Sequence, residues 1–211
     1  MAYPTENEML NALEKRIGKQ LLNKFQSAKV AVCGLGGLGS NIAISLARAG
    51  IGNLHIIDFD KVDISNLNRQ QYFASQLGIY KTEAMLHNLK EIAPYCKIKT
   101  DCIKINAENV KGLLENDDII CEAFDNPECK AMLVNNVIEK LPEKYIVSAS
   151  GMAGIASANE IRTRRITKHF YICGDGVSDV SEDNSLFSSR VMACAAHQAH
   201  TVLRIIAGCH E

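Results

Sequence analysis

Short apolar runs alternate along the chain with longer stretches in which apolar residues return every three or four positions. The runs lie at 29–34, 53–59, 96–103, 117–124 and 144–150, and the helical stretches lie at 38–49, 81–93, 107–116 and 127–140. Such runs, bounded by turn residues, predict buried strands, and the periodic stretches predict helices. Because strands and helices in alternation are typical of a parallel sheet covered by helices, we predict an α/β fold.

A helical arm is predicted ahead of the first strand. Thr5 and Glu8 have the spacing of a capping box, and apolar residues follow at helical intervals as far as Phe25. We therefore expect one amphipathic helix over residues 6–25, outside the alternating core.

The pattern changes after Gly151. Residues 157–175 predict two antiparallel strands, and residues 190–208 predict a closing helix that ends at Gly208. The loop at 174–190 is acidic and rich in Ser and Gly, which fits a mobile cover or a disordered connection. We expect a single domain over 1–211, with an arm (1–28), a parallel core (29–150) and an antiparallel extension with its closing helix (151–211).

The composition is that of a globular protein without a strong net charge. The 211 residues are 47% hydrophobic, enough to bury the core of one domain. With 23 basic and 24 acidic residues the net charge is -1, so any anion site must be local, and we expect no extra basic patch that would suit tRNA. No run approaches the roughly 20 apolar residues of a membrane span, and the first ten residues lack the pattern of a secretion signal. We expect a cytoplasmic protein that binds neither DNA nor membranes.

The eight cysteines are expected to be reduced thiols, as is usual in the cytoplasm. Several lie in apolar runs, where cysteine behaves as a small hydrophobic residue. Because no two of them form a C-x-x-C pair, a structural zinc site with paired ligands is not expected.

A glycine-rich turn follows the first predicted strand. Gly34, Gly36 and Gly39 fit the pattern G-x-G-x-x-G, and Gly37 lies between them. At a strand-to-helix turn such glycines let phosphate approach backbone N–H groups at the positive end of the helix. The motif alone also fits a turn that serves only to pack the helix closely on the strand.

Two carboxylates end the second predicted strand. Asp58 comes 19 residues after Gly39 (58 minus 39), close to the spacing of about 20 expected for a carboxylate that binds ribose hydroxyls, and Asp60 follows it. Together with the glycine turn, this predicts an adenine nucleotide site. A dehydrogenase would need a substrate-binding domain, for which little chain remains.

The segment after these carboxylates is rich in hydrogen-bond donors. Asn66, Arg69 and Gln70 would leave the carboxyl end of the sheet beside the glycine turn, where they can face phosphate groups. Lys81 occupies the first turn of the next predicted helix, where the helix dipole disfavours a positive charge unless an anion lies nearby. A solvated lysine offset by Glu83 is the alternative.

Asp125 follows the fourth predicted strand. Because Asn126 and Pro127 mark a helix start, Asp125 can be a structural residue that helps to cap it. Alternatively, its carboxylate lies near the Mg²⁺ that accompanies a triphosphate. Cationic, amide and carboxylate side chains converging on phosphates would stabilise the charge that develops as pyrophosphate leaves. We therefore assign three candidate catalytic residues: Arg69, Lys81 and Asp125.

The motifs "GLGGLGSN", "LARAGIG", "IIDFD" and "SNLNRQ" together resemble the ThiF-type adenylyltransferases (the ThiF/MoeB/HesA family), which activate ubiquitin-like carrier proteins in thiamine and molybdopterin biosynthesis. The likeness extends from about Arg16 to Gly208. Its most specific part is the D-x-D followed by S-N-L-N-R-Q, which ordinary dinucleotide-binding domains lack. The short length, with "SASGMAG", "YICGD" and "AAHQAH", is most similar to a compact ThiF subgroup.

The resemblance implies a Rossmann-like sheet and a reaction with Mg-ATP. In it, the C-terminal glycine carboxylate of a small ubiquitin-like sulfur carrier ending in Gly-Gly attacks the α-phosphate, giving an acyl adenylate and pyrophosphate. The implied roles are Gly36 near the nucleotide, Asp58 on the ribose, Arg69, Gln70 and Lys81 on the phosphates, and Asp125 beside the metal.

The resemblance also implies a homodimer in which an arginine of one subunit's amino-terminal arm reaches the ATP of the other. Arg16 is the nearest candidate, and a solvated helix arginine is the alternative. Larger relatives carry two C-x-x-C pairs for zinc, which this chain lacks. Cys173 is closest in position to the cysteine that some relatives use for sulfur transfer, although a buried, neutral thiol fits it better. His197 and His200 fit a metal, an interface or an ordinary helix surface.

Two other functions use the same nucleotide site. One is an ATP-dependent dehydratase or activating enzyme that acts on a small molecule or tRNA. The other is a regulator that binds NAD or ATP without adenylation activity. Exchange of labelled pyrophosphate into ATP separates them, because only the leading hypothesis requires a carrier protein for the exchange.

Overall fold

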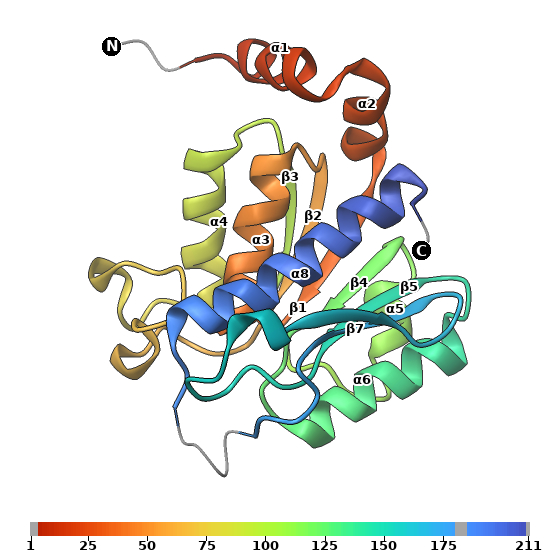
Figure 1. Cartoon of the computed structure of the whole chain (residues 1–211). Coiled ribbons are helices and arrows are strands. Elements are labelled where there is room, and N and C mark those ends of the chain that lie inside the picture. Colours follow the sequence, from red (N-terminus) through yellow and green to blue (C-terminus); the bar gives the residue numbers. More distant parts are fainter. Residues whose placement is uncertain (1–3, 180–184, 210–211) are drawn as a thin grey trace.

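The computed structural model describes residues 4–179 and 185–209. Its centre is a seven-stranded sheet in the order β3-β2-β1-β4-β5-β7-β6 (Figure 1). The strands are β1 Lys29–Cys33, β2 Asn53–Ile57, β3 Lys97–Asp101, β4 Ile119–Glu122, β5 Tyr145–Ala149, β6 Arg162–Arg165 and β7 Phe170–Gly174. Every pairing is parallel except that of β6 with β7, which is antiparallel and leaves β6 at the edge of the sheet. The predicted α/β fold with an antiparallel strand pair is confirmed.

Helices cover both faces of the sheet (Figure 1). Alternation along β1 sends Val30 and Val32 into one hydrophobic cluster and Ala31 and Cys33 into the other. The first cluster is covered by α3 Gly37–Ala49, α4 Lys81–Ile92 and α8 Ser188–Ala207, and the second by α5 Val110–Leu114 and α6 Pro127–Lys140. Because both faces of the central strands β1, β2, β4 and β5 are buried, these strands are apolar runs, which is why they could be predicted.

The predicted single arm helix is wrong. The arm consists of α1 Glu6–Ile17 and α2 Lys19–Ser27, which meet at Gly18 with φ +83°. Glycine adopts this left-handed conformation without a steric penalty, so the apolar period continues through a break that it does not reveal. The capping box of Thr5 and Glu8 is present, and α1 buries no residue.

Two other helix boundaries differ from the prediction. The helix expected over 107–116 is reduced to Val110–Leu114, because the Asn106 side chain accepts hydrogen bonds from the backbone N–H groups of Glu108 and Asn109 and so stabilises a turn instead. The closing helix begins at Ser188, two residues before its predicted start. Short 3₁₀ turns at Ile64–Asn66, Ala74–Gln76 and Ala158–Glu160 complete the connections.

Candidate nucleotide site

A cavity of ≈ 670 Å³ opens at the carboxyl ends of the central strands. The chain runs outward from β1 in both directions, so the crevice between β1 and β4 is the switch point at which α/β sheets bind ligands. Of the twelve residues predicted to bind the nucleotide, eleven line this cavity and Gly39 does not; the eleven are Gly34, Gly36, Gly37, Asp58, Asp60, Asn66, Arg69, Gln70, Lys81, Asp125 and Asn126.

Gly39 supports the glycine turn from behind. A Cβ atom at this position would overlap the carbonyl oxygen of Gly34, and Gly34 itself has φ +91°. The third glycine of the motif therefore allows α3 to begin directly against the turn, which is the packing role expected for it. A Cβ atom on Gly37 would lie 3.0 Å from the Val191 side chain and 3.4 Å from Cγ of Arg69, so the turn is closely covered on that side.

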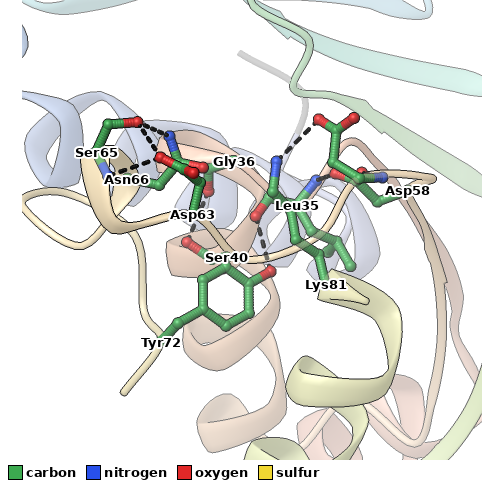
Figure 2. A network of polar contacts seen from close by, with 10 residues as sticks. Leu35, Gly36, Ser40, Asp58, Asp63, Ser65, Asn66, Tyr72 and Lys81 are labelled. Atoms are coloured by element: carbon green, nitrogen blue, oxygen red, sulfur yellow. Dashed lines mark hydrogen bonds and ion pairs between the residues drawn. The ribbon is translucent and has the colours of Figure 1, made fainter. Parts of the chain in front are cut away.

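Leu35, inside the glycine turn, is held through both of its backbone polar groups (Figure 2). Its N–H donates to Oδ2 of Asp58 at 2.6 Å, and its carbonyl accepts from the Tyr72 hydroxyl at 2.9 Å. The other Asp58 oxygen accepts from the amide of Asp60 at 2.7 Å. Burial raises the pKa of Asp58, and burial together with the Asp58 charge raises that of Tyr72. Asp58 therefore shapes the turn as well as lining the cavity, a role that the spacing did not suggest.

Lys81 is a buried cation that is paired with Asp60. Only 6% of the residue is exposed, and Nζ lies 3.0 Å from Oδ2 of Asp60. The alternative of a solvated lysine offset by Glu83 is therefore wrong. Asp60 is the anion that the position of Lys81 at a helix start requires, and the pair lies on the cavity wall.

The segment after β2 brings its donors to the cavity. Nη1 of Arg69 donates to the carbonyl of Ser65 at 3.1 Å and to Oδ1 of Asn68 at 2.9 Å, which fixes the guanidinium beside the glycine turn. Gln70 is 7% exposed, its Nε2 faces Gly36, and its Oε1 has no hydrogen-bond partner in the described part of the chain. A buried amide with a free oxygen at a cavity wall is a group that a ligand can satisfy.

The turn that carries these donors is stabilised by Asp63 (Figure 2). Its Oδ1 accepts from the backbone N–H and the hydroxyl of Ser65 at 2.8 and 2.6 Å. These two bonds lower the pKa of Asp63. Asp63 and Ser65 therefore build the turn, while Asn66, Arg69 and Gln70 line the cavity.

Asp125 and Asn126 have separate roles. The side chain of Asn126 caps α6 by accepting from the amide of Cys129 at 2.9 Å, so the alternative in which Asp125 helps to cap the helix receives no support. Asp125 is exposed at the cavity wall. Its carboxylate oxygens are of the type that Mg²⁺ prefers.

Lys130 is a cavity residue that the sequence analysis missed. It lies on the first turns of α6, and its Nζ is 2.6 Å from Oε2 of Glu122, which has no exposed surface. The Glu122 carboxylate also accepts from the Ser148 hydroxyl and, at 2.7 Å, from the amide of Phe124. The available signal was a Glu inside an apolar strand, which predicts a cationic partner nearby.

Two connections that border the cavity are tied together. The amides of Asp175 and Gly176 donate to the carbonyls of Gly151 and Ser150 at 3.0 and 2.9 Å. The Asp175 side chain accepts from Ser178 and forms an ion pair with Arg190 at the start of α8. Residues 174–179 of the loop are thus folded against the 150–151 turn, whereas 180–184 lie outside the described residues.

The remaining candidates lie away from the cavity. Cys173 is fully buried, and burial raises its pKa, which disfavours the reactive thiolate. Arg16 is exposed in the last turn of α1. Among residues 4–179 and 185–209, no three His, Cys, Asp or Glu side chains come together as a metal site, and no helix there is long and apolar enough to cross a membrane.

Exposed basic residues of the edge strand β6 bear on the expectation that the chain has no further basic patch. Arg162, Arg164 and Arg165 are all exposed on the edge strand β6, and Lys168 and His169 follow within four residues of its end. Because successive strand residues alternate between faces, Arg162 and Arg164 lie on one face of β6 and Arg165 on the other, and Arg162 and Arg164 form a small basic surface that the overall net charge of -1 conceals.

Comparison with known proteins decides the family. The sequence profile of the ThiF family matches residues 10–211. The chain belongs to the ThiF family. In this chain, residues of the glycine turn, the D-x-D motif and the S-N-L-N-R-Q segment line one cavity.

The curated relatives of this ThiF-family chain include bifunctional enzymes. It is 36% identical over 149 residues to the "Adenylyltransferase and sulfurtransferase UBA4" of Lodderomyces elongisporus, which covers 65% of this chain and 32% of the relative. It is 35% identical over 137 residues to the "Adenylyltransferase and sulfurtransferase MOCS3" of Aedes aegypti, covering 64% and 31%. The chain thus spans about one third of the length of these relatives.

Solved structures share the fold of this ThiF-family chain. Escherichia coli tRNA N6-threonylcarbamoyladenosine dehydratase TcdA in complex with ATP superposes with a TM-score of 0.84 at 20% identity, covering 96% of this chain and 95% of TcdA. Escherichia coli MccB with ATP gives a TM-score of 0.69 at 22% identity, covering 90% of this chain and 59% of MccB. At these identities the likeness establishes the fold alone.

Proposed function

We propose that this protein adenylates the C-terminal glycine carboxylate of a small ubiquitin-like sulfur carrier protein at the expense of ATP. The observation that carries the proposal is the convergence of eleven predicted nucleotide-binding residues on one cavity at the switch point of the sheet. Adenylyltransferase activity in the names of the UBA4 and MOCS3 relatives supports the same chemistry.

In the proposed site, the glycine turn receives the phosphates on its backbone N–H groups, and Asp58 holds the ribose. Arg69, Gln70 and Lys81 bind phosphate oxygens, and Asp125 contributes a carboxylate to the Mg²⁺ that accompanies ATP. Both Asp58 oxygens already accept one backbone N–H each. A carboxylate oxygen has more than one acceptor position, so ribose hydroxyls can donate to the same atoms.

In the proposed reaction, a carboxylate oxygen of the carrier forms a bond to the α-phosphorus, and the bond from that phosphorus to the bridging oxygen of pyrophosphate breaks. The bonding electrons leave with pyrophosphate, so negative charge grows on the leaving group. Arg69 and Lys81 stabilise this charge, and no nucleophile of the enzyme is required. The buried pairing of Lys81 with Asp60 keeps its ammonium group in place before ATP binds.

The finer parts of the proposal follow from the family resemblance. The carrier ends in Gly-Gly and is ThiS-like, and the pathway is thiamine biosynthesis in the cytoplasm. Two copies form a homodimer, in which Arg16 on the exposed α1 arm contacts the nucleotide of the partner subunit.

The test is carrier-dependent exchange of labelled pyrophosphate into ATP. We expect Arg69→Ala and Asp125→Ala to lower the exchange rate by about 10²-fold or more, as for the loss of a group that stabilises transition-state charge. The matched controls Arg48→Ala and Glu139→Gln alter exposed side chains outside the cavity and should leave the rate unchanged. Unchanged exchange in both site variants would overturn the assignment, and no exchange with any Gly-Gly carrier would favour the nucleotide-binding regulator.

The basic surface on β6 favours one second candidate, ATP-dependent modification of tRNA at the same cavity. Arg162 and Arg164 are exposed along an edge strand, where they can contact a phosphate backbone. If tRNA is the substrate, the double variant Arg162→Ala/Arg164→Ala should weaken tRNA binding. It should also make the slope of the logarithm of the binding constant against the logarithm of the salt concentration shallower by about one to two. Lys90→Ala/Lys111→Ala is the control, and equal effects of both pairs would exclude this candidate.

A further inference from the structure

A second cavity, of ≈ 380 Å³, lies between the edge strands and the C-terminal half of α8. It shares no lining residue with the nucleotide cavity. Its polar side chains come from β6, β7 and one face of α8; they are Thr163, Tyr171, His197, His200, Thr201 and Arg204. None of the Asp or Glu residues in the described part of the chain lines it. A polar cavity whose described lining includes no carboxylate suits a ligand that brings its own negative charge.

Tyr171 has a hydroxyl group that no other described residue uses. The residue is 3% exposed, and its hydroxyl has no hydrogen-bond partner among residues 4–179 and 185–209. Buried tyrosine hydroxyls are nearly always hydrogen-bonded, because a desolvated O–H without an acceptor is unfavourable. The unused O–H of a residue at the wall of a cavity can be satisfied by an acceptor that a ligand brings.

The hydroxyls and imidazoles around Tyr171 are already oriented. Thr201 donates to the carbonyl of His197 at 2.7 Å, and Oγ1 of Thr163 lies 3.1 Å from Nδ1 of His197. Because Nδ1 is occupied, the nitrogen of His197 that remains for a ligand is Nε2. His200 follows three residues later on the same face of α8, so both imidazoles border the cavity.

Positive charge is fixed next to the tyrosine. Strand alternation places Thr163 and Arg165 on the same face of β6, and Arg165 lies opposite Tyr171 in the register. The Arg165 guanidinium packs 5.7 Å from the centre of the Tyr171 ring and donates to the carbonyls of Thr167 and Lys168 at 3.2 and 3.0 Å. These contacts hold a cation beside the cavity, which raises the local potential for an anion.

We propose that this cavity binds a compact organic anion, with a carboxylate or phosphate oxygen that accepts the Tyr171 O–H. The imidazoles of His197 and His200 contact the same anionic group, while Ala196 and Ile205 supply an apolar wall for its short carbon chain. This second site is independent of the adenylation proposed above, because none of its residues reaches the nucleotide cavity.

The test uses sodium phosphate, sodium acetate and sodium butyrate, each compared with sodium chloride at the same ionic strength. Binding is followed by calorimetry and by the NMR ring signals of His197 and His200, which report on this cavity even if phosphate also occupies the first one. We expect saturable shifts of both rings with at least one probe, and the preferred probe distinguishes a carboxylate from a phosphate ligand. Tyr171→Phe should weaken binding about tenfold, the effect of one hydrogen bond to a charged acceptor.

Tyr171→Phe removes no hydrogen bond within the described residues, so the variant should fold normally. Tyr80→Phe, on the surface beside α4, is the control and should bind like the wild type. As a second variant, Ala196→Leu fills the cavity from the exposed face of α8 and should abolish the ring shifts. The proposal is overturned if no probe shifts the rings more than chloride does, or if both cavity variants bind as tightly as the wild type.

Discussion

The ammonium group of Lys130 lies 2.6 Å from Oε2 of Glu122, whose side chain has no exposed surface. This contact joins the start of α6 to the end of β4 beneath the nucleotide cavity. A carboxylate buried this deeply requires its partner, because removing the partner leaves an uncompensated charge.

We predict that Lys130→Met lowers the free energy of unfolding by about 3 kcal/mol or more. Urea unfolding without nucleotide measures this, so an effect on ligand binding does not contribute. Lys140→Met is the control at the other end of α6, where Nζ donates to the backbone carbonyl of Ala107 and, among the described residues, forms no ion pair. Equal losses of unfolding free energy in the two variants would show that the buried Glu122 carboxylate does not require Lys130 as its partner.

Gly39→Ala should disrupt the glycine turn, because the added methyl group would overlap the carbonyl of Gly34. We expect the free energy of unfolding to fall by about 3 kcal/mol or more, which is at or above the upper end of the cost of overpacking a protein core. We also expect the variant to lose ATP binding. Gly112→Ala is the matched control, since nothing lies within 4 Å of its added Cβ. That change on α5 should be neutral or stabilising by about 0.5–1 kcal/mol. Thermal unfolding with and without ATP measures both effects.

His55 on β2 links two carboxylates that come from distant parts of the chain. Its Nδ1 lies 2.8 Å from Asp117 and its Nε2 lies 2.7 Å from Asp101, and the residue is 3% exposed. His55→Leu should lower the unfolding free energy by about 3 kcal/mol, because the buried Asp117 carboxylate loses its side-chain partner. His87→Leu, on the exposed side of α4, should change it by less than about 0.5 kcal/mol. A small effect at His55 would contradict a structural role for this bridge.

Asp175 should make stability depend on pH in the acid range. Burial raises its pKa, but hydrogen bonds from Val177 and Ser178 and the charge of Arg190 outweigh burial and hold the pKa below its ordinary value of 3.8. A lowered pKa contributes stability that is complete above pH 3.8 and is lost as the pH falls through the folded-state pKa. Asp175→Asn should therefore lower the unfolding free energy by about 2 kcal/mol at pH 7 and by progressively less below pH 4.

Urea unfolding at pH 7, 4 and 3 tests this prediction. Glu139→Gln on the exposed face of α6 is the control, since it removes a carboxylate without such contacts. If the difference in unfolding free energy between the wild type and Asp175→Asn stays constant down to pH 3, the lowered pKa of Asp175 is not its cause.

The sequence was most informative where burial and backbone conformation restrict the residue type. Strands covered on both faces appear as apolar runs, and the glycines of the turn stand where a Cβ atom would collide, so both could be predicted. The break at Gly18 could not, because apolar spacing continues across it and glycine is also tolerated within helices.

The site was predicted less completely than the fold. Residues that follow a strand could be placed at its carboxyl edge, which brought Asp58, Arg69 and Asp125 together. Lys130 was missed because its role depends on a buried carboxylate eight positions earlier, and that contact becomes visible only when α6 is placed over β4. The basic strand β6 was missed because a sum of charges over the whole chain contains no information about where they lie.

The joined turns at 150–151 and 174–176 have a mechanical consequence. Because their backbones are hydrogen-bonded to each other and Arg190 anchors the second turn to α8, the rim of the nucleotide cavity on this side is one body, not two independent flaps. Displacing either turn would break hydrogen bonds to the other or the ion pair that joins Asp175 to the first turn of the twenty-residue helix α8. The two turns and the start of α8 are therefore expected to move together wherever a ligand enters from this side.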